Sequence, residues 1–265
     1  ETKAKSVPVT LNRRAVAGLK LQSAVARVFL PVLYPVYNLL FRLVLRYRVP
    51  GWRAKQAEIR EVIGRQKRPL LICPNHLTMI DSIILIWILN PWWRTIWDAR
   101  LRFFAWNIPE KTNYSHIPLL RFFTYVGRCI EIVREGSRAK TRRLLDKLQV
   151  LLMHGQSIMI FPEGKRSRSG TVDTRDFTYG TGRIIEELRG RNLNPLVLCL
   201  YLRGRNQKTY GTLPKRNESF YLDYSVIEPE TSHKGLRAQR DISTQIVNTL
   251  AELERQYFAR TSFSR

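Results

Sequence analysis

The chain has 265 residues, of which 44% are hydrophobic, and this composition excludes an intrinsically disordered protein. Its length allows one large α/β domain or two small ones. Lys and Arg number 45 against 21 Asp and Glu, so the net charge is +24. Such an excess indicates a polyanionic partner: nucleic acid, an anionic membrane face or a phosphorylated substrate.

The N-terminal residues combine positive charge with the most apolar run in the chain. Residues 1–60 hold 12 Lys or Arg and 2 Asp or Glu, and residues 24–45 read AVARVFLPVLYPVYNLLFRLVL. Two arginines and two prolines interrupt this run, so it suits a membrane-spanning helix poorly. We predict that residues 1–47 form a basic, apolar helical arm, kinked or paired, that docks into one leaflet of an anionic membrane. The alternative is a proline-bent helix packed on the protein's own core.

Strand and helix patterns alternate along the rest of the chain. Short apolar runs bounded by turn residues predict five strands, at residues 69–73, 126–133, 157–161, 195–202 and 219–227. Apolar residues at helical spacing predict helices at residues 56–65, 81–89, 137–152, 182–189 and 235–258. This order predicts a single α/β domain, residues 48–265, with a mostly parallel central sheet flanked by helices.

The three cysteines, Cys73, Cys129 and Cys199, each fall in an apolar, strand-like run. Their spacing fits no metal site, so we interpret them as buried thiols of a protein that faces the cytosol. The N-terminal apolar run also lacks the small-residue cleavage site of a secretory signal. We therefore expect a membrane-associated protein on the cytoplasmic face, which in a bacterium is the face of the inner membrane.

A polar segment, CPNHLTMIDS at residues 73–82, separates the first predicted strand from an apolar helix. Asp81 falls at the predicted helix start, where the helix dipole and free amides favour an ionised carboxylate. If His76 lies in the loop, the chain can fold back so that this carboxylate fixes the imidazole tautomer and makes the other ring nitrogen a better base. Such a base would activate a hydroxyl of a substrate. The alternative is that His76 is an ordinary loop residue and Asp81 only caps the helix.

A second polar loop, FPEGKRSRSG at residues 161–170, follows the third predicted strand. Arginine side chains and backbone amides beside glycines suit a phosphate, although the loop could also be a solvated basic segment. Both polar loops leave the carboxyl ends of predicted strands, where ligands bind to open α/β sheets. We therefore expect the two loops to meet on one edge of the sheet.

The two loops together resemble motifs of the glycerolipid acyltransferase family, whose members acylate glycerol phosphate and lysophosphatidic acid. The family motif Asn-His-x4-Asp is matched by Asn75, His76 and Asp81. The family motif Phe-Pro-Glu-Gly-Thr-Arg-Ser is matched by residues 161–167, except that Lys165 stands in place of Thr. This pair of motifs in this order is specific, and the resemblance covers residues 48–205.

Other family positions are matched only in part. Phe177 and Gly180 resemble the Phe-x-x-Gly that usually follows the second loop. In the family motif Gly-x-x-Phe-x-x-Arg, which begins here at Gly127, Ile130 replaces Phe and the arginine, Arg134, comes one residue late. Thr178 stands where the family usually has Lys after the Phe. In a further motif that begins at Pro195, Leu198 replaces the second proline. These changes bear on the identity of the acceptor more than on the chemistry.

The resemblance implies acyl transfer from an acyl thioester, either acyl-CoA or acyl carrier protein, to a hydroxyl of a lysophospholipid such as lysophosphatidic acid. His76 would act as the general base and Asp81 would orient it, with no metal or other cofactor. The substrate-binding residues would be Asn75, Arg134, Glu163, Gly164, Arg166 and Ser167. The expected partners are the acyl donor, the lipid acceptor and an anionic membrane surface, without nucleic acid.

Three alternatives stay open on the sequence. The first is the same chemistry on a specialised acceptor, a lyso-aminolipid or a glycolipid. The second is a basic nucleic-acid-binding protein, although no motif of that class occurs and the aromatic residues cluster with Leu and Ile instead of alternating with basic residues. The third is a catalytically inactive membrane-binding relative, against which the intact His76, Asp81 and Glu163 argue. An assay of thiol release from the donor with a panel of acceptors would separate them.

Overall fold

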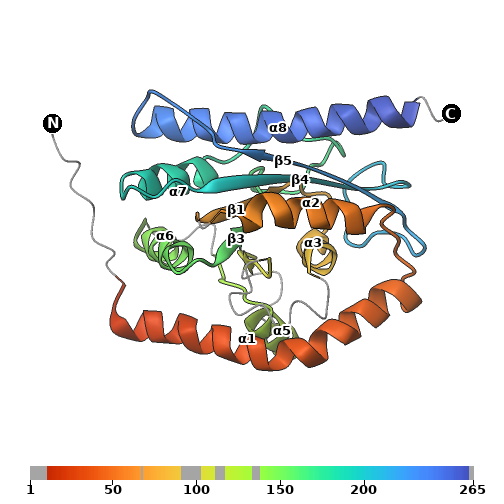
Figure 1. Ribbon diagram of the computed structural model, residues 1–265, viewed down its shortest axis with the longest axis horizontal. Coiled ribbons are helices and arrows are strands. Elements are labelled where there is room, and N and C mark those ends of the chain that lie inside the picture. Colours follow the sequence, from red (N-terminus) through yellow and green to blue (C-terminus); the bar gives the residue numbers. More distant parts are fainter. Residues whose placement is uncertain (1–10, 67, 91–102, 111–116, 133–137, 263–265) are drawn as a thin grey trace.

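The computed structural model describes residues 11–66, 68–90, 103–110, 117–132 and 138–262. A five-stranded sheet lies at the centre with helices on both faces (Figure 1). The strands lie in the order β2-β3-β1-β4-β5, the first four are parallel to one another, and β5 is antiparallel to β4. This arrangement confirms the predicted α/β fold with a mostly parallel sheet.

The elements agree with most of the predicted ones. The strands are β1 (Leu70–Pro74), β2 (Trp106–Asn107), β3 (Ser157–Met159), β4 (Leu196–Gly204) and β5 (Phe220–Ile227). The helices are α1 (Arg13–Leu39) with its π-helical continuation η1 (Leu40–Val44), α2 (Trp52–Gly64), α3 (Asp81–Leu89), α5 (Pro118–Val126), α6 (Arg138–Met153), α7 (Gly180–Arg189) and α8 (Leu236–Ser262). All five predicted helices and four of the five predicted strands are present.

The predicted strand at residues 126–133 is wrong. Its first residue ends helix α5, and its described remainder makes only isolated bridges, at Cys129 and Ile132. Arg128, directly before the first of these bridges, has a φ of 57°, a left-handed conformation that a strand excludes. Cys129 is accordingly half-buried instead of lying inside a strand, and the sheet edge is formed by the short β2.

Alternate residues of the central strands face opposite sides of the sheet. In β1, Leu70 and Ile72 join a core with α2 and α3, whereas Leu71 and Cys73 join a second core with α6, α7 and α8. Burial on both faces explains why a central parallel strand reads as a continuous apolar run.

Helix α1 closes both cores along the side of the molecule opposite α8 (Figure 1). Its buried residues lie at helical spacing on one stripe: Leu19, Gln22, Ala26, Leu30 and Tyr34. The arm predicted for residues 1–47 is therefore, from residue 13 onward, one continuous helix that contains Pro31 and Pro35. It bends in its middle (Figure 1), as expected where proline removes a backbone donor and crowds the preceding turn.

Candidate active site

Three loops leave the sheet at the same end. Strands β3, β1 and β4 are adjacent and parallel, so their carboxyl ends lie side by side. The loop after β1 carries His76, the loop after β3 carries Glu163 and Arg166, and the loop between β4 and β5 spans residues 205–219. The two polar loops singled out in the sequence meet here, because the backbone amide of His76 donates a hydrogen bond to Glu163 Oε1 at 3.1 Å.

His76 and Asp81 lie against each other. Asp81 is the first residue of α3, and its Oδ2 lies 3.3 Å from His76 Nδ1. The same Oδ2 accepts hydrogen bonds from the backbone amides of Leu77 and Thr78, each at 2.7 Å, and Oδ1 accepts one from the Thr78 hydroxyl. The carboxylate is thus fixed by the loop that it closes. Asp81 is buried, and the His76 side chain is 20% exposed.

The second loop fixes both the backbone and the ring of His76. The amide of Ser167 donates to the His76 carbonyl at 2.8 Å, so both backbone groups of His76 bond to the second loop. The imidazole stacks on Phe161, with ring centroids 4.0 Å apart and an interplanar angle of 23°. Among the residues that the structure describes, Nε2 of His76 makes no hydrogen bond, so this ring nitrogen remains available.

Glu163 is a buried carboxyl group between the two loops. It is 1% exposed, and its oxygens accept from the His76 amide, the Ser167 hydroxyl and, at 3.3 Å, the Asp173 amide. Burial raises the pKa of Glu163, and the three hydrogen bonds act in the opposite direction. These contacts hold the loops together at the position where His76 is presented.

Gly164 is required by the shape of the second loop. Its φ is 68°, and a Cβ at this position would lie 2.3 Å from Thr178 Cγ2. Thr178 is one of the departures from the family pattern. The amide and the hydroxyl of Thr178 both donate to the Pro162 carbonyl, at 3.2 and 3.1 Å. These bonds hold Thr178 against Gly164 of the same loop.

Arg166 faces the third loop. Its Nη1 donates to the Gly211 carbonyl at 3.0 Å, and its guanidinium carbon lies 5.6 Å from the ring centroid of Tyr210. The Gly211 amide in turn donates to the Leu77 carbonyl at 2.9 Å, beside His76. Sequence reasoning missed this loop. The available signal was its length, because hairpin connections are usually only two to five residues long.

The remaining predicted site residues fall into two groups. Asn75 is buried, and its side-chain amide bonds to both backbone groups of Leu202 in β4, accepting at 2.8 Å and donating at 3.1 Å. Its carboxamide thus joins the first loop to β4, and its predicted role in substrate binding stays a prediction. Arg134 lies outside the described residues. The part of the chain that the structure describes contains no group of three His, Cys, Asp or Glu side chains that could hold a metal ion.

Comparison with known families agrees with this geometry. A family model described as Acyltransferase matches residues 55–199, which is more than half of the chain. No curated protein matches the chain significantly. The matched span contains both polar loops and the strands β1 and β3 from which they leave. The chain therefore belongs to the acyltransferase family, the glycerolipid acyltransferases whose motifs its two polar loops resemble.

Proposed function

We propose that this acyltransferase moves a fatty acyl group from an acyl thioester, acyl-CoA or acyl carrier protein, to a hydroxyl of a lysophospholipid such as lysophosphatidic acid. The observation that carries the proposal is the contact between His76 Nδ1 and the buried Asp81 carboxylate, with Nε2 free of hydrogen bonds to the described residues. A histidine oriented in this way is suited to act as a base at neutral pH.

In the proposed mechanism, Asp81 accepts a hydrogen bond from Nδ1–H and so fixes the tautomer in which Nε2 carries a lone pair. Nε2 removes the proton of the acceptor hydroxyl as its oxygen attacks the thioester carbonyl. The carbon–sulfur bond then breaks, and the departing thiolate takes the proton from the imidazolium. The products are the ester and the free thiol, and the base is regenerated without a covalent acyl-enzyme.

The anionic part of the acceptor is proposed to bind beside Arg166. The guanidinium lies at the junction of the second and third loops, next to the first. Its single hydrogen bond to the described residues is to the Gly211 carbonyl, which leaves its other N–H groups for a ligand. A planar guanidinium binds a phosphate through paired hydrogen bonds. Gly164 and the buried Glu163 and Ser167 shape this site by holding the loop, and Arg134 is proposed as a second cation for the acceptor.

A specialised acceptor, a lyso-aminolipid or a glycolipid, remains the second candidate within the same chemistry. Replacement of the family's usual Lys by Thr178 motivates it, because Thr178 supplies no positive charge at this position. We propose no nucleic-acid partner, since the family accounts for the polar loops and a lipid surface accounts for the basic, apolar arm.

We further propose that α1 and α5 dock the enzyme on the cytoplasmic face of an anionic membrane. Helix α1 with η1 is long and apolar enough to cross a membrane. Its buried stripe is nevertheless bonded to the domain, because the Gln22 side chain donates to the carbonyls of Tyr125 and Cys129, each at 3.0 Å. A helix held in this way fits docking in the plane of the membrane better than spanning it. Its other sides expose Leu21, Val28, Phe29, Val32, Val36, Leu39, Leu40, Leu43 and Val44.

Helix α5 extends the same apolar surface. It lies beside α1, with Phe29 and Phe122 in an edge-to-face contact at 5.3 Å, and it exposes Leu119, Leu120 and Tyr125. An exposed apolar surface of this extent indicates a lipid or protein interaction site. The basic residues along α1 and η1, which include Arg13, Arg14, Lys20, Arg27 and Arg42, favour an anionic lipid surface.

The chemical proposal is tested by thiol release from palmitoyl-CoA and from palmitoyl acyl carrier protein with a panel of lysolipids. We expect His76→Ala to lower turnover by about 10²–10⁴ with the fold intact, because the base is lost. Asp81→Asn should also be severe, since an amide does not stabilise the imidazolium. His233→Ala is the matched control, because His233 lies 3.8 Å from Asp241 in an exposed pair away from the loops. Near-full turnover by a folded His76→Ala protein would exclude the mechanism.

A further inference from the structure

A buried ion pair lies directly under the second and third loops. Arg203 on β4 and Glu254 on α8 are 5% and 7% exposed, and Arg203 Nη1 lies 3.6 Å from Glu254 Oε1. The hydroxyl of the fully buried Tyr201 donates to the same Oε1 at 3.0 Å. Removing two charges from water is costly, and a hydrophobic pair of the same volume often stabilises a protein as well or better. Stability alone therefore gives little reason for an ion pair at this position.

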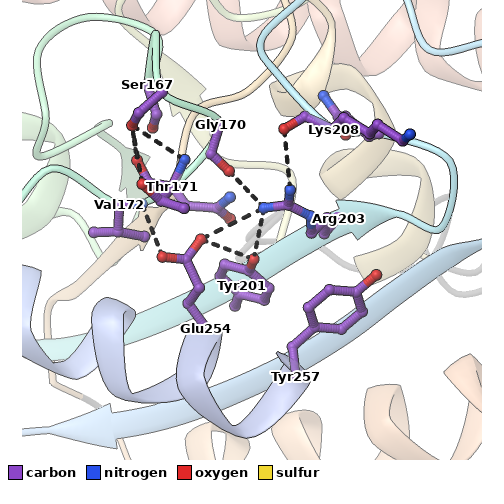
Figure 2. Close-up of polar contacts among 12 residues, drawn as sticks. Ser167, Gly170, Thr171, Val172, Tyr201, Arg203, Lys208, Glu254 and Tyr257 are labelled. Carbon is purple, nitrogen blue, oxygen red and sulfur yellow. Dashed lines mark hydrogen bonds and ion pairs between the residues drawn. The ribbon is translucent and has the colours of Figure 1, made fainter. Parts of the chain in front are cut away.

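Arg203 Nη1 also donates to the Tyr201 hydroxyl at 3.3 Å, and the remaining hydrogen bonds of the pair go to the two loops (Figure 2). Arg203 donates through Nη1 to the Gly170 carbonyl at 2.5 Å and through Nη2 to the Lys208 carbonyl at 3.4 Å. Glu254 Oε2 accepts from the Val172 amide at 3.0 Å. One guanidinium thus bonds to both loops, and its carboxylate partner bonds to the second loop as well.

The two loops are in direct contact at this point. Gly170 has a φ of 75°, and a Cβ there would lie 2.3 Å from the Lys208 carbonyl oxygen. Only glycine allows this approach. The separation of the loops is therefore set where the guanidinium bonds to both of them.

Each loop continues from this contact to the candidate active site. On the second loop, Asp173 follows Val172, and its amide donates to Glu163, which in turn accepts from the His76 amide. On the third loop, Lys208 is followed three residues later by Gly211, whose carbonyl accepts from Arg166. The contacts of Arg203 and Glu254 thus lie one or a few residues from the groups that position His76 and Arg166.

We propose that Arg203 and Glu254 are positioning residues, which set the second loop against the third and thereby hold Arg166 and the acceptor-binding surface in place without touching substrate. Both members of the pair bond to loop backbone groups, and the aromatic rings of Tyr257 and Phe258 pack against the guanidinium, with centroids 5.7 and 4.9 Å from its central carbon. The acceptor part of this inference rests on the proposed function, whereas the effect on the loops does not.

The effect on the loops is tested by hydrogen–deuterium exchange of the whole chain without substrate. We expect Glu254→Gln and Arg203→Lys to accelerate exchange in peptides covering residues 163–173 and 205–213, and to leave β1 protected. Arg203→Lys keeps the charge but not the planar fork, and it serves as the second variant if Glu254→Gln does not fold. Asp223→Asn is the matched control, because the buried Asp223 pairs with Lys55 at 2.6 Å and its contacts with described residues do not include either loop.

The kinetic test uses lysophosphatidic acid and palmitoyl-CoA as probes. For both variants we expect kcat/KM for the acceptor to fall by about tenfold to a hundredfold, with the KM of the donor unchanged. Asp223→Asn should change neither the acceptor kcat/KM nor the donor KM. Unchanged loop exchange in both variants, or acceleration spread equally over the chain and matched by Asp223→Asn, overturns the positioning role. A wild-type protein that transfers no acyl group to any acceptor overturns the proposed function instead, and the exchange result still decides the role of the pair.

Discussion

Arg166 is the side chain whose role follows most directly from its neighbours. It belongs to the second loop, bonds to the third through Gly211, and lies beside Tyr210, so its guanidinium is at the junction of two walls of the site. A cation at such a junction is placed to meet an anionic headgroup. Glu163, by contrast, has its oxygens occupied by protein donors, one of which is the backbone amide of His76.

The first residue-scale prediction concerns Arg166. Replacement by Ala should raise the acceptor KM, because one charge-assisted fork contributes about 1.5–3 kcal/mol. Arg166→Lys should recover only part of this loss, since an ammonium does not reproduce the planar fork. Arg168→Ala is the matched control, because Arg168 is an exposed arginine of the same loop. Equal changes in donor and acceptor kinetics would show that Arg166 is structural or serves the donor.

The second residue-scale prediction is a pH dependence of stability that arises from Glu163. Burial raises the pKa of this carboxyl above its ordinary value of 4.5, so the folded protein binds the proton more tightly than the unfolded chain does. Stability from this group is therefore present at low pH and is lost as pH rises from the ordinary value through the folded-state pKa. Glu163→Gln mimics the neutral acid, so its Tm relative to wild type should rise as the pH increases above the ordinary value of 4.5.

Glu228→Gln provides a control of opposite sign for this pH dependence. A hydrogen bond from Arg68 lowers the pKa of Glu228, so the stability due to this group is present above its ordinary pKa and is lost as pH falls. The Tm of Glu228→Gln relative to wild type should therefore fall as pH rises, if it changes measurably at this exposed site. Parallel pH curves for Glu163→Gln and wild type would contradict the assignment of a raised pKa to Glu163.

At the scale of elements, α1 and α5 share one apolar surface. Six of the nine residues of α5 are exposed although the helix reads PLLRFFTYV, and its contact with α1 runs through Phe122 and the backbone of Tyr125. The buried stripe of α1 packs on the domain and also bonds to it, since the Tyr34 hydroxyl donates to the carbonyl of Trp87 at 2.7 Å. Deleting the whole arm would therefore open both cores, so membrane docking is better tested on the exposed residues.

The element-scale prediction is that polar substitutions on this surface weaken membrane binding without unfolding the domain. We expect the triple variant Val28→Gln, Val32→Gln, Val36→Gln, and separately Leu119→Gln, to co-sediment less with vesicles of phosphatidylglycerol and phosphatidylcholine. Leu236→Gln is the control, because Leu236 is as exposed as these residues and begins α8 on the opposite side of the molecule (Figure 1). Wild-type binding should survive moderate salt, since apolar burial adds to electrostatic attraction. A wild-type protein that stays in the supernatant at low salt would contradict docking.

At the scale of the whole molecule, the parallel sheet decides where the chemistry is assembled. The loops that follow three adjacent strands lie at one end of the sheet. Residues far apart in sequence meet there: His76 with Glu163, and Arg166 with Gly211. Helix α8 also contacts this end of the sheet, because Glu254 accepts a hydrogen bond from the Val172 amide of the second loop (Figure 2). The surface of α1 and α5 that we propose docks on a membrane lies on the side of the molecule away from α8 (Figure 1).

The sequence by itself determined the fold class, most of the elements and the family to which the two polar loops point, and it supplied the candidate catalytic residues in those loops. These depend on local information: alternating strand and helix periodicity, and short motifs such as Asn75 to Asp81. It failed at residues 126–133, because an apolar run of that length does not distinguish a strand from a helix end followed by a left-handed residue.

Only the tertiary structure decided which distant groups meet. Nothing local in the sequence marks Arg203 as the partner of Glu254 or Gly211 as the partner of Arg166, because these contacts follow from strand order and from the packing of α8. The exposure of α5 is also a tertiary result, since its apolar residues would read the same in a buried core. Periodicity reports the environment of one element, whereas pairing between elements depends on the packing of the whole chain.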